Sequence, residues 1–135
     1  MKKLALLFSA AILFLAACNT PNTKIKEHIS DADSVAINYF KGDGTMDSVT
    51  TVKIIRDKKT IVQLAELIGK ESSGTINKCG YDGSLHFFKQ NIVVQNIDFR
   101  MNDVNCMQFS FLQEGKITAT ILTPEAKQLL ESVRK

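Results

Sequence analysis

The chain has 135 residues, of which 44% are hydrophobic and 23% charged, the composition of an ordinary globular protein. The formal charge is +3, but Lys2 and Lys3 lie in the first 17 residues, and the other 118 carry 15 basic and 14 acidic side chains. A nearly neutral domain lacks the positive surface that attracts nucleic acid, so we expect no nucleic-acid partner. The length suits one domain with its own core.

The first 17 residues have the layout of an export signal. Residues 1–3 are Met-Lys-Lys, and the apolar run over 4–15 is too short for a permanent membrane span. Leu15-Ala16-Ala17-Cys18 then resembles the lipobox of bacterial lipoproteins. The resemblance implies a signal-peptidase site between Ala17 and Cys18 and a lipid on Cys18 that anchors the protein in the membrane. An ordinary secretory signal that contains a cysteine is the alternative.

The residues after Cys18 indicate the membrane to which such a lipoprotein is sorted. Asn19 follows the cysteine, so the aspartate that retains enterobacterial lipoproteins in the inner membrane is missing, as is the acidic cluster that directs surface export in Bacteroidetes lipoproteins. The resemblance therefore implies the cell envelope, at the outer membrane and facing the periplasm. Residues 18–32 are mainly polar and predict a flexible tether, since Ile25 and Ile29 are too few to define a helix. Residues 33–135 form the predicted domain.

The first half of this domain predicts two strands and a helix. The strands are expected over 34–40 and 46–56, joined by a Gly/Asp turn at 41–44. Over 58–68 apolar residues recur at helical spacing, with Asp57 as a candidate N-cap and Gly69 as a candidate C′ residue.

The second half predicts an antiparallel meander and a closing helix. Strands are expected over 84–89, 92–101, 106–111 and 116–122, and Thr123-Pro124-Glu125 is a typical helix start. The order is strand-strand-helix followed by four strands and a helix. We therefore predict an α+β fold, with a single antiparallel sheet and two helices packed on one face. The other face is then polar, covered by a partner, or lined for a ligand.

Cys79 and Cys106 are an even pair in an exported chain, which favours a disulfide between them. Cys106 alternates with Met107, Phe109 and Phe111 on a predicted strand, so it is expected to point away from the core. We expect the two Cα atoms to lie within about 7 Å, the reach of such a bridge. Two buried free thiols are the alternative, and two cysteines alone are a poor zinc site.

No catalytic, cofactor or metal site is predicted. The serines lie outside any nucleophile elbow, and the phosphate-loop, EF-hand and histidine-cluster patterns are missing. His28 falls in the predicted tether, and a lone strand histidine such as His86 is more often a surface or hydrogen-bonded residue than a base. Asp82 and Asp98 could be imagined as paired acids, but Asp82 is interpreted first as a turn residue.

The segment Lys78 to Gly83 with the later Cys106 resembles small lipoproteins of Bacteroidetes-type bacteria, a pattern that implies no particular activity. Asp33-Ser34-Val35 and Asp47-Ser48-Val49 are similar to the O-glycosylation sequon of that phylum, which implies modification of Ser34 and Ser48. A turn and a strand edge are the alternative interpretation.

Exposed aromatic residues could mark a binding surface, because Phe40 and Phe88 fall on strand faces opposite Tyr39 and Phe87. Our leading hypothesis is a non-enzymatic, membrane-anchored lipoprotein whose domain binds a protein partner or serves a structural role. A small inhibitor or immunity-type lipoprotein and an enzyme with a minimal site are the alternatives.

Overall fold

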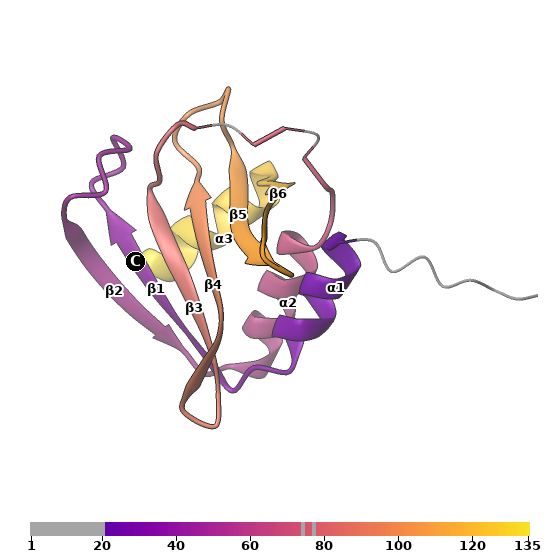
Figure 1. Cartoon of the computed structure of the whole chain (residues 1–135). Helices are drawn as coiled ribbons and strands as arrows, with labels where there is room; N and C mark the ends of the chain where they lie inside the picture. Colours follow the sequence, from indigo (N-terminus) through magenta and orange to yellow (C-terminus); the bar gives the residue numbers. More distant parts are fainter. Residues whose placement is uncertain (1–20, 74, 77) are drawn as a thin grey trace, which may run out of the picture.

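The computed structural model describes residues 21–73, 75–76 and 78–135, which form one α+β domain (Figure 1). Six strands make a single antiparallel sheet in the order β2-β1-β3-β4-β5-β6. The elements in chain order are α1 (Pro21–Ser30), β1 (Ser34–Phe40), β2 (Val49–Ile55), α2 (Lys58–Ile68), β3 (Gly83–Lys89), β4 (Ile92–Arg100), β5 (Gln108–Gln113), β6 (Lys116–Ile121) and α3 (Pro124–Arg134). The predicted fold class is confirmed, with one helix more than expected.

The helix α1 corrects the predicted tether. Ile25 and Ile29 lie four residues apart on one face of α1 and are fully buried, and Ala32 is buried just after it. Two isoleucines suffice here because they join the core formed with α2 and the sheet, and tertiary packing supplies most of a short helix's stability. The flexible-tether prediction is therefore wrong for 21–32, while 18–20 lie outside the described residues.

The helix α2 begins and ends where the sequence predicts. Asp57 is the N-cap, and its carboxylate accepts hydrogen bonds from the backbone N–H of Thr60 (3.0 Å) and from its hydroxyl (2.6 Å). Gly69 is the C-cap of the helix, one position before the C′ place predicted for it, and its φ is −90°. A Cβ at Gly69 would lie 2.6 Å from Lys26 Cβ and 2.7 Å from Asn22 O, so the glycine is needed for the close approach of α1.

The core lies between the three helices and one face of the sheet. Alternate strand residues enter it, among them Tyr39 from β1, Phe87 from β3, Phe99 from β4 and Phe109 from β5. The buried hydroxyl of Tyr39 donates to the backbone oxygen of Leu130 on α3 at 2.6 Å, and burial raises the pKa of Tyr39 to about 12. We call the opposite side of the sheet, which the helices leave uncovered, the free face.

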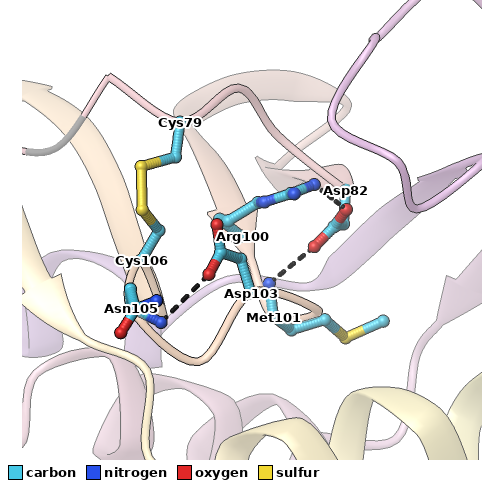
Figure 2. Close-up of a disulfide and its surroundings, with 7 residues drawn as sticks. All are labelled: Cys79, Asp82, Arg100, Met101, Asp103, Asn105 and Cys106. Atoms are coloured by element: carbon cyan, nitrogen blue, oxygen red, sulfur yellow. Dashed lines mark hydrogen bonds and ion pairs between the residues drawn. A yellow bond between two sulfur atoms is a disulfide. The ribbon is translucent and has the colours of Figure 1, made fainter.

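The predicted disulfide between Cys79 and Cys106 is present, with the two Cα atoms 6.2 Å apart (Figure 2). It joins the connection between α2 and β3 to the loop 101–107 that precedes β5. Cys106 was expected inside a strand, but its backbone N–H bonds Asp103 O in a turn, and β5 starts two residues later. The bridge therefore joins two loops at one end of the sheet.

Candidate functional site

The free face has a polar centre and exposed apolar residues toward both sides. One row of paired residues crosses all six strands in the order Val52, Asn38, Ser84, Asp98, Ser110, Ala119. The strand neighbours of its four polar members are buried in the core, so the row itself points to the free face. The exposed apolar side chains on this face are Val49, Val52, Ile54, Val93, Leu112 and Ile117.

His86 organises the hydrogen bonds at the centre of the free face. Its Nδ1 lies 2.6 Å from Asn96 Oδ1, and its Nε2 lies 3.0 Å from Ser84 Oγ and 3.2 Å from Asn38 Nδ2. These partners fit the tautomer that donates from Nδ1 to Asn96 and accepts at Nε2. The histidine is thus a hydrogen-bonded strand residue, as the sequence suggested, and it holds side chains from β1, β3 and β4 in one network.

Three residues of this network are of the types that can serve as nucleophile, base and orienting group in catalysis, namely Ser84, His86 and Asn96. Two features argue against acyl transfer at this point. Ser84 is only 7% exposed. It pairs with Asn38 on one side and Asp98 on the other, so the backbone N–H groups around it take part in the hydrogen bonds of the sheet. An oxyanion needs donors that the sheet leaves free.

Asp98 lies next to this network on β4 and is partly buried. Burial raises the pKa of its carboxyl group, and the nearby imidazole of His86 partly opposes that shift. Directly across the β4–β5 pair is Ser110, whose hydroxyl is buried and has no hydrogen-bond partner among the residues described here. The sequence singled out Asp98 only as an imagined partner of Asp82, and gave no signal for Ser110.

Asp82 has a different role from the turn residue predicted for it. Its carboxylate is buried and accepts from Arg100 Nη1 at 2.5 Å and from the backbone N–H groups of Met101 (2.7 Å) and Asn102 (2.8 Å). Figure 2 shows this ion pair beside the disulfide. Asp82 and Asp98 therefore do not form a pair of acids, because the carboxylate of Asp82 is engaged in hydrogen bonds at the end of β4.

The remaining predicted sites are dispersed. Ala17 and Cys18 lie outside the described residues. Ser34 is the first residue of β1 and Ser48 directly precedes β2, and both are partly buried. His28 lies on α1, where its Nε2 is 3.0 Å from Val94 O, rather than in a tether.

Two hollows of about 470 Å³ each lie over the helices and are lined mainly by α1, α2 and α3, away from His86. On the free face, a smaller one of about 240 Å³ is lined by residues that include Val93, Asn96 and Leu112. A carboxylate oxygen of Asp103 lies within 4.8 Å of both cysteine sulfur atoms, but these are bonded to each other and offer no thiolate in this state.

No protein-family model, curated protein or solved structure matches the chain. Within the described ranges, none of the helices has the length and apolar character needed to cross a membrane.

Proposed function

We propose that this protein is a non-enzymatic lipoprotein of the bacterial cell envelope, anchored by a lipid on Cys18, and that its free face binds a protein partner. The anchor proposal rests on the lipobox resemblance of residues 15–18, and the absence of a sorting aspartate at Asn19 supports the outer membrane, facing the periplasm. The observation that carries the binding proposal is the set of exposed apolar side chains on the free face.

These side chains occupy both sides of the sheet. Val52 and Ile54 of β2 are 55% and 54% exposed, and Leu112 and Ile117 at the other side are 60% and 62% exposed. Polar groups from β1, β3 and β4 lie between them. Several exposed apolar side chains on one face support partner binding there, and the shallow relief favours a protein over an enclosed small molecule.

We expect charges on this face to prevent partner binding. The variant with Val52→Lys and Leu112→Lys should capture its partner from the envelope at least about tenfold less well in quantitative cross-linking and affinity capture, because binding would bury two unpaired ammonium charges. Both side chains are exposed, so the fold should be kept. Val62→Lys is the matched control, because Val62 is exposed on α2. Equal loss in the control, or no loss in the double variant, would contradict the proposal.

We expect Cys18→Ser to abolish lipidation, because the thioether needs the sulfur atom. Labelling with a fatty acid should mark the wild-type protein and leave the variant unmarked, and fractionation should move the variant out of the outer membrane. Cys79→Ser serves as the control, since the disulfide lies far along the chain from the lipid. A labelled Cys18→Ser protein, or cleavage of the wild-type domain by protease added to intact cells, would contradict the proposed anchor or its orientation respectively.

Two alternatives give different results in the same experiments. An inhibitor or immunity-type lipoprotein would capture a toxin or a hydrolase through the free face. An enzyme with a minimal site would use Ser84 and His86. The buried position of Ser84 and the engagement of the surrounding backbone in the sheet favour binding over catalysis.

A further inference from the structure

Asp98 differs from three other aspartates of this domain in the hydrogen bonds that its carboxylate accepts. Asp82 binds Arg100 and two backbone N–H groups, Asp57 caps α2, and Asp33 accepts from Gln90 N at 2.7 Å. Among the described residues, no hydrogen-bond donor is bonded to the Asp98 carboxylate, although the side chain is partly buried. A partly buried carboxylate is stabilised by a donor or an opposite charge, so Asp98 can still accept from a donor that a partner brings.

A second polar group without a bonded partner lies beside it. Ser110 is 3% exposed, its hydroxyl has no hydrogen-bond partner within the part of the chain that the structure describes, and it is paired with Asp98 across β4 and β5. A buried hydroxyl without a partner costs free energy, so the sheet next to Asp98 holds a polar group that its own chain leaves unbonded among the described residues. The Asp98 carboxylate thus lies without a bonded donor, among the described residues, on the surface to which we assign partner binding, and the unbonded Ser110 hydroxyl is buried next to it.

We propose that Asp98 anchors the guanidinium group of an arginine side chain supplied by the protein partner. This inference rests on the proposed function of the free face and names the chemistry that it recognises. A guanidinium carries the complementary charge, and its planar fork of five donors can bind both carboxylate oxygens at once. An ammonium group has only three donors and is more strongly hydrated.

The surface next to Asp98 suits the apolar stem of such a residue. The hollow of about 240 Å³ is lined by Val93, Asn96 and Leu112, and Asn96 precedes Asp98 by two residues on the same strand face. That spacing is about 7 Å, which a long side chain can bridge. The methylene groups of the arginine would cover Val93 and Leu112 while its head reaches the carboxylate.

The test uses the mature chain in detergent micelles and N-acetyl-arginine N-methylamide as the probe, followed by amide chemical shifts in NMR. We expect saturable shifts at residues around Asp98, Ser84 and Ser110. The citrulline analogue, which is neutral and of the same shape, should cause none. Asp98→Asn should weaken binding of the arginine probe by at least about tenfold, as for loss of one partner of a charge pair.

Asp98→Asn should remain folded. Because burial raises the pKa of Asp98, the ionised carboxylate subtracts stability as pH rises past the ordinary aspartate pKa, and asparagine removes this effect. Its melting temperature at pH 7 should equal or exceed that of the wild type. Glu131→Gln, on the exposed side of α3, is the control and should bind the arginine probe like the wild type.

Equal shifts with arginine and citrulline, stronger binding of the lysine analogue, or unchanged binding by Asp98→Asn would each overturn the arginine anchor. The proposed function would survive such a result if the variant with Val52→Lys and Leu112→Lys still lost its partner. Conversely, an arginine site that depends on Asp98, together with unaffected partner capture by the double variant, would overturn docking on this face.

Discussion

Asp82→Ala is expected to lower the free energy of unfolding by about 3–5 kcal/mol, the cost of removing one partner from a buried ion pair. The substitution leaves the largely buried Arg100 guanidinium without its carboxylate and also frees the backbone N–H groups of Met101 and Asn102. Small domains have a total stability of about 5–15 kcal/mol, so the variant should be partly unfolded near body temperature. Chemical denaturation followed by circular dichroism measures the loss.

Two further variants separate the charge from the rest of the interaction. Asp82→Asn keeps the shape and one acceptor oxygen, so it should lose less than alanine but still leave Arg100 without a counter-charge. Asp103→Ala is the matched control, because Asp103 accepts from Asn105 N only two residues along its own loop (Figure 2). A loss in Asp82→Ala no larger than in Asp103→Ala would show that the ion pair contributes nothing to stability.

Cys79→Ala is expected to lower the free energy of unfolding by about 2–5 kcal/mol, the usual cost of removing a native disulfide from a small exported domain. The bridge closes a segment of 27 residues that contains β3 and β4. Its loss therefore raises the conformational entropy of the unfolded chain and removes the covalent link that holds the loop 101–107. Equilibrium denaturation of the oxidised wild type and of the variant gives the difference. Lipidation should be unchanged.

A second measurement checks the oxidation state directly. Apart from Cys18, to which we assign the lipid, the unfolded, unreduced protein should show no thiol reactive toward a titration reagent, since the other two cysteines are bonded. Two free thiols would end the disulfide prediction. The bridge and the Asp82–Arg100 pair lie beside the same loop, so losses in a double variant should deviate from the sum of the single ones.

The sequence predicted those parts of the fold whose signals are local. The four apolar positions of α2, the cap at Asp57 and the alternation around Phe109 each act within one element, and the structure confirms them. The helix α1 was missed because most of its residues are polar and its two isoleucines become decisive only when α2 and the sheet bury them. The burial of Asp82 was missed because its partners lie 18 to 20 residues further on.

The candidate site was even less predictable. His86 was placed on the correct strand face, but its partners come from β1, which is distant in sequence, and from β4. The juxtaposition of Asp98 and Ser110 depends on the register between β4 and β5, which the long loop 101–107 leaves undetermined in the sequence. Alternation assigns a residue to a face, but it does not choose its neighbour across the strands.

The start of α1 at Pro21 has a consequence for the range over which the protein can act. Only three peptide units separate Cys18 from Pro21, a span of at most about 10 Å. With the proposed lipid on Cys18, the domain would lie close to the bilayer surface instead of moving through the periplasm on a long flexible linker. A partner would then have to come within reach of that surface, and one held in the same membrane would meet the domain by lateral diffusion in two dimensions.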